Sequence, residues 1–480
     1  MPAYVLEIVT LSLGLLLLLA EAFVGPGHKR CIGYAAILGL LVTLCLLPFT
    51  CSCTGPTAFW SFYSPDRLAL FYKGLALICT IVVLILSLDY LPVLEQFAAR
   101  AGGGPAVGEF FALPVFICTG MMWMASAVDL TSIFVSLELI TIAFYVMVGY
   151  QRKNRLSLEA AVKYLILGAI STGFLVYGLS WLFGVTGQTN LLAIEQVLQT
   201  TDNQQAALFA LALLLVGLAF KVAAVPFQFW VPDVYQGAAT PVTAFLSVGS
   251  KSAGFIIAYR LLHPFLASPV LHGTTISLLV ALAGATLLVG NLAAIPQTNF
   301  KRLLAYSSIS HAGFLLLALA CVPVKSQLSP IQVVSFYLAG YLVMTMLSFA
   351  VVGVINRVSG SDDFTAFDGL ATRSPFLAFA MLISAVSLAG VPLTVGFLGK
   401  FFVFTLAVDS GYTWPVVIAI IGAAAGFYYY LKIVRAMYWN PPKETAPITV
   451  GATMKVLVIL LIAATLILGV YPQPLLSLLQ

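Results

Sequence analysis

The chain has 480 residues, of which 61% are hydrophobic and only 8% are charged. A soluble domain carries about 25% charged residues to cover its surface, so this composition excludes a water-soluble protein and predicts a polytopic membrane protein. The net charge of +5 arises from 22 Lys and Arg against 17 Asp and Glu. The basic residues occur in short runs, which argues against nucleic-acid binding.

Apolar segments long enough to cross about 30 Å of hydrocarbon recur from one end of the chain to the other. We predict fourteen transmembrane helices and therefore an all-α polytopic fold, with residues 1–480 forming a single membrane-embedded domain. The first helix carries Glu7 and lacks the basic stretch of a signal peptide, so we expect it to be retained. The predicted helices span residues 4–23, 31–49, 68–90, 110–127, 129–150, 158–184, 206–230, 240–262, 270–292, 302–322, 330–356, 376–407, 413–438 and 452–472.

Basic residues are distributed unevenly between the predicted loops. Sixteen fall in loops or at the adjoining helix ends, thirteen of them at odd-numbered loops and three at even-numbered ones. Basic loops stay in the cytoplasm, so we expect the odd loops to be cytoplasmic and both termini to lie on the outer side. The thirteen are Lys29, Arg30, Arg100, Arg152, Lys153, Arg155, Lys301, Arg302, Arg357, Arg373, Lys432, Arg435 and Lys443, and the three are Arg67, Arg260 and Lys325.

The remaining six of the 22 basic residues lie inside predicted helices. A charged side chain at the membrane centre costs about 2.5–3.5 kcal/mol on insertion scales, so each is expected to be paired, functional or near the interface. Two lie near helix ends, where a lysine can extend to the interface: Lys73 and Lys455. The four predicted to lie deeper are Lys163, Lys221, Lys251 and Lys400.

Glu138, near the middle of the fifth helix, is the one carboxylate predicted to lie deep. Removal from water disfavours an ammonium ion, and a nearby carboxylate favours it. A change in the distance between Glu138 and Lys221 would therefore make this lysine hold or release a proton, and we expect the two to pair. The alternative is an inert ion pair that clamps two helices. Lys163 follows Glu159 by four residues on the same helix face, so these two are also expected to pair.

Helix-breaking residues lie beside two of the deep lysines. Lys221 is followed by Pro226, and Lys400 is preceded by Gly390 and Pro392. A proline inside a membrane helix frees a backbone carbonyl, and such carbonyls can hold an ammonium ion at the membrane midplane. Because the pattern occurs in the seventh and again in the twelfth helix, it predicts two repeated units, each with a broken helix.

Polar side chains also enter the tenth predicted helix, where Ser307, Ser308 and Ser310 precede His311. An imidazole titrates near neutral pH, so His311 is a candidate proton relay. The alternative is a buried histidine that only makes hydrogen bonds.

The remaining motifs give no support for a cofactor. Cys51 and Cys53 form a C-x-C without a second ligand pair, so no metal site is expected there. No nucleotide, haem or iron–sulfur motif is present, so we expect this chain to bind no cofactor and to carry no electrons. Several aromatic residues, including Trp181 and Tyr428 to Tyr430, are interpreted as anchors at the membrane interface.

Four segments carry a family resemblance over nearly the whole chain. They are EAAVKYLILGAISTGFLVYG (159–178), FKVAAVPFQFWVPDVYQGAATPVTAFLSVGSK (220–251), NFKRLLAYSSISHAG (299–313) and SLAGVPLTVGFLGKF (387–401). The sequence resembles subunit N of proton-pumping NADH–quinone oxidoreductase, respiratory complex I, within a wider antiporter-like family that includes Mrp cation/proton antiporters. The resemblance implies fourteen helices with outward termini and two inverted five-helix repeats, approximately 110–262 and 270–438.

The resemblance also implies a proton path through five residues. Glu138 matches the acidic residue of the fifth helix, Lys221 the lysine of the broken seventh helix, and Lys251 the lysine of the eighth. His311 lies in the motif of the tenth helix, and Lys400 matches the lysine of the broken twelfth helix.

One position departs from the family pattern. Many relatives have His where this chain has Gln228, and an amide cannot carry a proton.

The function implied is that of a non-redox, proton-translocating subunit of an oxidoreductase in an energy-transducing membrane, most simply a bacterial inner membrane. Its implied partners are lipids, protons and the other antiporter-like and small membrane-arm subunits. NADH, FMN, iron–sulfur clusters and quinone are expected in other subunits. The alternative function is a subunit of an Mrp-type Na⁺(K⁺)/H⁺ antiporter.

Overall fold

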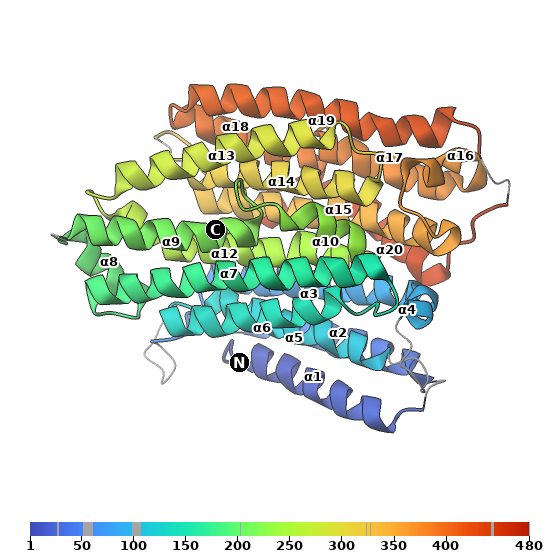
Figure 1. Ribbon diagram of the computed structural model, residues 1–480, viewed down its shortest axis with the longest axis horizontal. Helices are drawn as coiled ribbons and strands as arrows, with labels where there is room; N and C mark the ends of the chain where they lie inside the picture. The colour runs from blue at the N-terminus through green and yellow to red at the C-terminus, as the bar shows by residue number, and fades with distance from the viewer. Residues whose placement is uncertain are drawn as a thin grey trace.

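The computed structural model describes residues 1–25, 28–50, 61–97, 107–201, 203–322, 324–326, 328–442 and 446–479. These residues form a bundle of long helices that lie side by side (Figure 1), and within the described ranges there are isolated β-bridges but no strands. Four residues discussed above, Cys51, Cys53, Arg100 and Lys443, lie outside the described residues.

The helices follow the order expected from the apolar segments. They are α1 (Val5–Phe23), α2 (Arg30–Leu46), η2 (Leu47–Phe49), α3 (Arg67–Asp89), α4 (Leu91–Phe97), α5 (Gly108–Ser126), α6 (Leu130–Val148), α7 (Arg155–Thr186), α8 (Leu191–Gln199), α9 (Gln204–Val222), α10 (Trp230–Gly237), α11 (Thr240–Phe245), η3 (Leu246–Ser250), α12 (Lys251–Ala267), α13 (His272–Ala294), α14 (Phe300–Leu319), α15 (Pro330–Ser359), η4 (Phe364–Phe367), α16 (Leu370–Arg373), α17 (Pro375–Ala389), α18 (Val395–Asp409), α19 (Thr413–Trp439), α20 (Ala452–Val470) and α21 (Gln473–Ser477).

The fourteen predicted spans are confirmed. Thirteen helical segments of the described chain are long and apolar enough to cross a membrane, and α11, η3 and α12 together make one of them. The fourteenth span is α17 followed by α18, two shorter helices separated by residues 390–394. Both predicted breaks are present, because the seventh span is likewise divided into α9 and α10.

The break after α9 is stabilised locally. Ala223 adopts a left-handed conformation with φ 64° and ends the helix, and Pro226 has no N–H to continue the helical bonding. The indole N–H of Trp230 donates to the carbonyl oxygen of Phe220 at 3.1 Å. The N–H of Val225 donates to the Thr286 hydroxyl at 3.0 Å. The polar groups freed by the break are thus paired with other protein groups, as a membrane interior requires.

The two broken helices run in opposite directions. In Figure 1 the chain passes from left to right through α9 and α10, and from right to left through α17 and α18. This is the arrangement that inverted repeats require. The approximate repeat boundaries, 110–262 and 270–438, stay a prediction.

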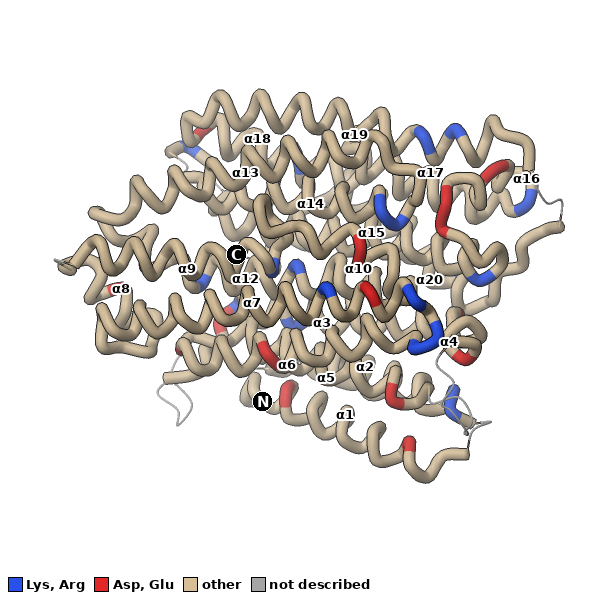
Figure 2. Tube along the Cα trace, viewed as in Figure 1, with Lys and Arg blue, Asp and Glu red and all other residues tan. Residues whose placement is uncertain are grey.

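Burial differs strongly between the inner and outer helices. The segment from α11 to α12, together with α14 and α15, is almost fully enclosed by the other helices. In contrast α1, α2, α7 and α20 expose most of their apolar surface, as helices that face lipid or neighbouring subunits do. Lys and Arg gather at the end of the bundle beside α4 and α16 (Figure 2), in agreement with the uneven charge predicted for the loops.

Candidate functional site

Lys221 lies in the last turn of α9, immediately before the break, and is buried. Its Nζ donates a hydrogen bond of 2.7 Å to the hydroxyl of Thr141 on α6. A cavity of about 20 Å³ adjoins it, lined in part by Thr141, Tyr164, Ser250 and Gly254. This volume is sufficient for one water molecule. Lys221 and Ser250 both line this cavity, and Ser250 directly precedes Lys251.

Glu138 lies on the same helix as Thr141 but faces a different neighbour. Its Oε1 accepts a hydrogen bond of 3.1 Å from the Thr172 hydroxyl on α7. The carboxylate is half-buried and lines a groove of about 570 Å³ between α6 and α7, together with Tyr145 and Leu165. The Glu138 carboxylate therefore faces the lateral surface of the bundle.

The predicted direct pair of Glu138 with Lys221 is not formed. Among the ion pairs of the described residues, none joins these two side chains. The Lys221 ammonium donates to the Thr141 hydroxyl instead. Thr141 follows Glu138 by three residues, so the two side chains point about 60° apart around the helix axis. The connection between the carboxylate and the lysine is indirect, through one turn of α6.

Lys251 begins α12 directly after the π-helical turn η3. Its Nζ donates to the backbone carbonyl oxygen of Ser308 on α14 and lies 5.6 Å from the centre of the Tyr341 ring on α15. π-helical turns widen a helix by one residue and are frequent at functional sites. Here the turn precedes the lysine that reaches from the first half of the chain to the second.

His311 is held by two tyrosines in the interior of the bundle. Its Nδ1 lies 2.7 Å from the Tyr337 hydroxyl on α15, and its Nε2 lies 3.4 Å from the Tyr430 hydroxyl on α19. Tyr430 also hydrogen-bonds the hydroxyl of Ser307, one turn earlier on α14. Both ring nitrogens thus face a hydroxyl that can donate or accept a proton.

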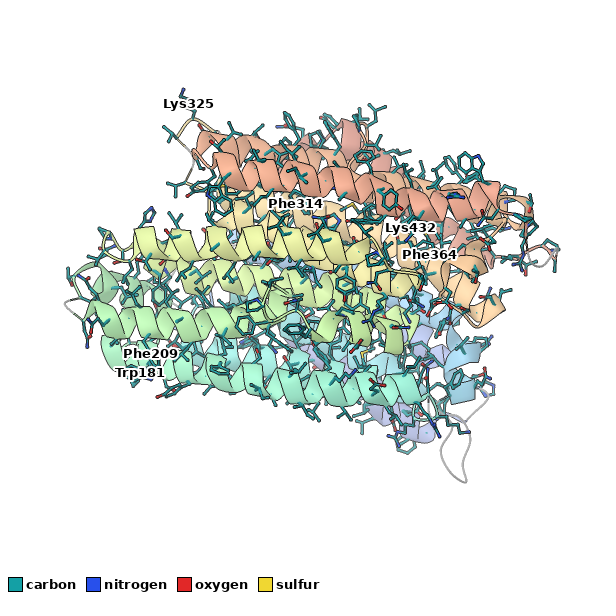
Figure 3. The ribbon with its side chains drawn as sticks, turned by 45° about the horizontal axis from the view of Figure 1, so that its top comes forward. Trp181, Phe209, Phe314, Lys325, Phe364 and Lys432 are labelled. Atoms are coloured by element: carbon teal, nitrogen blue, oxygen red, sulfur yellow. The ribbon has the colours of Figure 1, made fainter. Side chains whose placement is uncertain are left out.

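Lys400 binds the carbonyls that its own broken helix leaves free. Its Nζ donates to the carbonyl oxygens of Leu388 at 2.8 Å and Ala389 at 2.9 Å, both at the end of α17. The ammonium lies 5.5 Å from the centre of the Phe314 ring. In Figure 3 Phe314 lies along the length of the bundle, away from the end that carries Lys325. The prediction that freed carbonyls hold an ammonium is confirmed at Lys400. At Lys221 it is wrong, because a threonine hydroxyl takes that role.

The structure therefore divides the five predicted site residues into two groups. The first group is arranged around α14. His311 lies on this helix, and Lys251 and Lys400 contact its residues Ser308 and Phe314. Lys221 hydrogen-bonds α6, on which Glu138 lies, and lines the small cavity that also reaches Ser250. Buried lysines, hydroxyls and one imidazole thus lie between the two broken helices in separate hydrogen-bonded groups.

Sequence reasoning missed the neutral members of these groups. No distinctive spacing marks Thr141, Tyr337 and Tyr341. Only the fold shows that Thr141 and Tyr341 are buried beside lysines and that Tyr337 is buried beside His311. The interpretation of Tyr429 and Tyr430 as interface anchors is wrong, because both are buried, and only their neighbour Tyr428 is exposed.

Some charged residues differ in burial from what their predicted positions suggested. Lys73, expected near a helix end, is fully buried within the protein, and its Nζ lies 2.7 Å from the carboxylate of Glu7 on α1. Glu7 is therefore a buried carboxylate in addition to Glu138, which is half-buried. Lys163 has a side chain that is 42% exposed at the surface of the bundle. Arg260 lies buried in α12 rather than in a loop, and pairs with Asp66 at 2.9 Å.

The expected pairing of Lys163 and the expected position of Lys455 near a helix end are confirmed. Lys163 pairs with Glu159 at 2.6 Å, as predicted, and in addition with Asp233 at 2.7 Å. Lys455 is exposed in the first turn of α20. Gln228, in the break after α9, is buried, and its side-chain oxygen has no hydrogen-bond partner among the described residues.

Comparison with known proteins identifies relatives over the whole chain. The profile of a family described as NADH:quinone oxidoreductase/Mrp antiporter, TM, matches residues 127–426. NADH-quinone oxidoreductase subunit N of Heliobacterium modesticaldum is 40% identical over 448 residues, which cover 93% of this chain and 91% of the relative. The subunit of the same name from Moorella thermoacetica is 38% identical over 470 residues, covering 98% and 95%.

Solved structures agree with these relatives. A chain of respiratory complex I from Thermus thermophilus superimposes with a TM-score of 0.80 at 32% identity, covering 98% of both chains. A chain of the Mrp complex from Dietzia sp. DQ12-45-1b reaches a TM-score of 0.81 at 20% identity, which shows a common fold. This chain therefore belongs to the NADH-quinone oxidoreductase subunit N family, within the NADH:quinone oxidoreductase/Mrp antiporter group of membrane proteins.

Proposed function

We propose that the chain is a proton-translocating membrane subunit of an NADH–quinone oxidoreductase and has no redox centre of its own. The observation that carries this proposal is the line of buried protonatable groups between the two broken helices, in a chain 40% identical to a subunit N. Enclosing four charged or titratable side chains in a membrane bundle costs free energy, so their presence indicates a function such as transport. NADH, FMN, iron–sulfur clusters and quinone would be bound by other subunits.

The geometry supports a sequence of short proton transfers. Lys221 hydrogen-bonds Thr141, whose hydroxyl can accept from an ammonium or donate to a neutral amine. One water in the adjoining cavity would connect this pair to Ser250 and the start of α12. Lys251 would carry the proton next, as an ammonium that donates a hydrogen bond to the Ser308 carbonyl oxygen of α14.

The second half of the path follows α14. Ser307, Tyr430 and His311 form a continuous set of hydroxyl and imidazole contacts, and Tyr337 bonds the other ring nitrogen. A proton accepted at one nitrogen of His311 can leave from the other. Lys400 would receive it at the break between α17 and α18.

Glu138 is proposed as the trigger for this sequence. Its carboxylate faces the lateral groove rather than Lys221, so a neighbouring membrane subunit could change its charge or position. The effect on Lys221 would be electrostatic, because Glu138 lies one turn of α6 away from Thr141, the hydrogen-bond partner of Lys221. We further propose that the assembly resides in a bacterial inner membrane, with both termini of this chain on the outer side.

Replacement of Lys221 tests the proposal. In vesicles that contain the assembled complex, Lys221→Met should lower the number of protons translocated per NADH oxidised, because a positioned proton-transfer group contributes about 10²–10⁴-fold to its step. Lys455→Gln, which alters an exposed lysine, is the matched control and should pump as the wild type does. Subunit content on native gels verifies assembly. A fully assembled Lys221→Met complex with the wild-type proton ratio would disprove the proposal.

An Mrp-type Na⁺(K⁺)/H⁺ antiporter subunit is the second candidate, favoured by the shared fold alone. Purification in mild detergent distinguishes the two. Co-migration with flavin and iron–sulfur subunits supports the oxidoreductase, whereas co-migration with other small antiporter subunits supports the alternative.

A further inference from the structure

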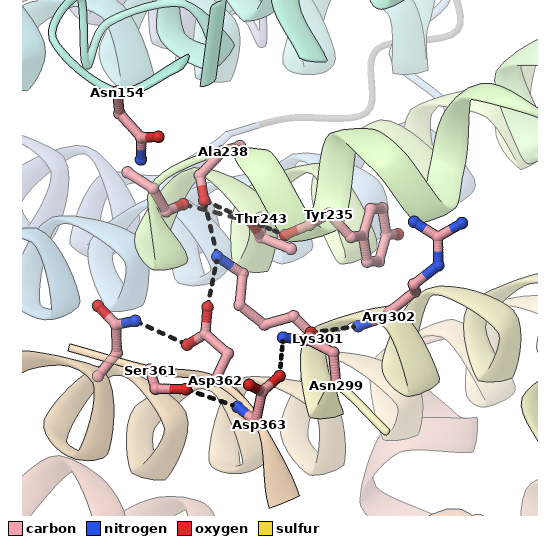
Figure 4. A network of polar contacts seen from close by, with 12 residues as sticks. Asn154, Tyr235, Ala238, Thr243, Asn299, Lys301, Arg302, Ser361, Asp362 and Asp363 are labelled. Carbon is pink, nitrogen blue, oxygen red and sulfur yellow. Dashed lines mark hydrogen bonds and ion pairs between the residues drawn. The ribbon is translucent and has the colours of Figure 1, made fainter. Parts of the chain in front are cut away.

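The first turn of α14 carries two consecutive basic residues, Lys301 and Arg302. Cations at a helix N-terminus are disfavoured by the helix dipole, so another interaction must hold them there. Both residues reach α10, the short half of the first broken helix. Figure 4 shows Lys301 between Ala238 and Asp362, in a network that joins the two halves of the chain.

Lys301 binds the C-terminal end of α10. It is buried, and its Nζ donates to the carbonyl oxygen of Ala238 at 2.8 Å. Ala238 is the residue that caps α10, so the ammonium meets the negative end of that helix dipole. Asp362, 3.4 Å away, balances the charge and is itself bonded by Asn356 of α15.

Arg302 binds the side chains of α10. Its Nη1 donates to Asp233 at 2.8 Å and to Gln236 at 3.1 Å. Asp233 also pairs with Lys163 of α7 at 2.7 Å, so its carboxylate is held from two sides. Lys301 and Arg302 thus bind two side chains of α10 and its C-cap residue, and Asp233 is also held by α7.

This attachment matters because α10 has only eight residues. A helix of two turns has little stability of its own, and its orientation depends on the contacts that it makes. Its first residue, Trp230, donates to the Phe220 carbonyl next to Lys221. The position of α10 is therefore transmitted to the turn that carries Lys221.

The same helix that holds α10 also binds Lys251. The Tyr235 hydroxyl of α10 lies 3.1 Å from the hydroxyl of Ser308, and the backbone carbonyl of Ser308 accepts from Lys251. The loop that follows α14 contacts the other broken helix. There the N–H groups of Val324 and Lys325 donate to Asp409 at the end of α18. One helix thus contacts both broken spans and the central lysine.

We infer that Lys301 and Arg302 are positioning residues that tie α10 to α14, so that the broken seventh helix and the carbonyl that binds Lys251 move together. Neither residue touches the proposed path itself. They act through Ala238, Asp233 and Gln236, and their effect is to keep the turn that carries Lys221 in register with the Ser308 carbonyl that binds Lys251. This role rests on the proposed proton translocation.

The test uses the assembled complex with Lys301→Met, Arg302→Gln and the conservative Arg302→Lys. Amide hydrogen exchange in α10 should rise about two- to thirtyfold in the first two variants, the range expected for loss of a coupling contact. Protons translocated per NADH oxidised should fall in the same two variants. Arg302→Lys keeps the charge next to Asp233 and should restore most of both properties. Lys455→Gln serves as the control for loss of a basic residue.

Gln236→Leu provides a milder variant if Lys301→Met does not assemble, because it removes a single neutral partner of Arg302. It should raise exchange in α10 less than Arg302→Gln does. Unchanged exchange in every assembled variant would overturn the attachment of α10. Raised exchange with an unchanged proton ratio would overturn the positioning role. A wild-type complex that moves no protons would instead overturn the proposed function, and the exchange result would still report on the attachment.

Discussion

At the scale of single residues, the three central lysines differ in what accepts their hydrogen bonds. Lys251 and Lys400 donate to backbone carbonyls, which can only accept. Lys221 donates to the Thr141 hydroxyl, which can also donate. The Thr141 hydroxyl itself donates to the Leu137 carbonyl oxygen at 2.7 Å, so it links Lys221 to the backbone of α6. Each lysine keeps N–H donors after it loses its proton, but only at Lys221 is the partner a hydroxyl that can also donate to the neutral amine by turning away from Leu137.

This difference gives a prediction for Thr141. Thr141→Val keeps the side-chain volume and removes the hydroxyl, so a buried ammonium loses a hydrogen bond worth about 1.5–3 kcal/mol. We expect proton translocation per NADH oxidised to fall clearly, with normal assembly. Thr141→Ser retains the hydroxyl and should stay close to the wild type. Equal proton ratios in the two variants, measured with a pH-sensitive dye in vesicles, would show that the hydroxyl has no role.

The residue scale also shows what sequence cannot supply. The five predicted site residues could be found because a charge in an apolar segment stands out, and a histidine among serines does too. The hydroxyls that join them could not, because threonine and tyrosine are common in membrane helices. Lys73 was misplaced because its partner Glu7 is 66 residues away in the chain and its burial depends on the packing of α1 against α5 and α2.

At the scale of helices, both broken spans depend on close contact between their two halves. Gly396 is the clearest example. A Cβ atom at this position would lie 1.9 Å from the carbonyl oxygen of Ser387, so α18 can approach the end of α17 only because residue 396 is glycine. The Gly396 N–H also donates to the Ser387 hydroxyl at 3.2 Å. This contact keeps Lys400 within reach of the carbonyls at the end of α17.

Gly396→Ala is therefore expected to separate the halves of the twelfth span. The added methyl group meets backbone rather than a flexible side chain, and we expect a loss of about 1–3 kcal/mol in the free energy of unfolding. Thermal inactivation of the solubilised complex measures this loss. Gly451→Ala, at a position with open space around it, is the control and should inactivate at the wild-type temperature. A Gly396→Ala complex as stable as the control would contradict the close contact.

Helix boundaries and breaks were largely predictable, and the reason is physical. A membrane helix requires a continuous apolar segment, and Pro and Gly interrupt it at positions visible in the sequence. The breaks after Lys221 and before Lys400 follow from Pro226, Gly390 and Pro392. At Lys400 the partners are carbonyls of its own broken span, which the sequence predicts. At Lys221 the partner is a hydroxyl of another helix, α6, and it became known only with the fold.

At the scale of the whole molecule, the uneven charge at the two ends determines the expected orientation in the membrane. Basic residues gather at the end of the bundle beside α4 and α16 (Figure 2), which should face the cytoplasm. Lys325 lies in the loop at the opposite end, and Arg435 is exposed in the last part of α19. These two positions report on opposite sides.

The orientation can be measured with single cysteines. In a variant lacking the native cysteines, Lys325→Cys should react with a membrane-impermeant thiol reagent added from the periplasmic side. Arg435→Cys should react only after the membrane is permeabilised. The reverse pattern would show that the termini face the cytoplasm and that the positive-inside rule fails for this chain.

The cavity beside Lys221 has a consequence for ion selectivity. With about 20 Å³, it admits one water molecule, so a passage from Lys221 to Ser250, both in the first half of the chain, is a single molecule wide. A sodium ion surrounded by its hydration shell is too large to enter. A proton needs no such space, because it passes by exchange of hydrogen bonds. The narrowness of this passage would let the bundle conduct protons without allowing metal cations to leak through it.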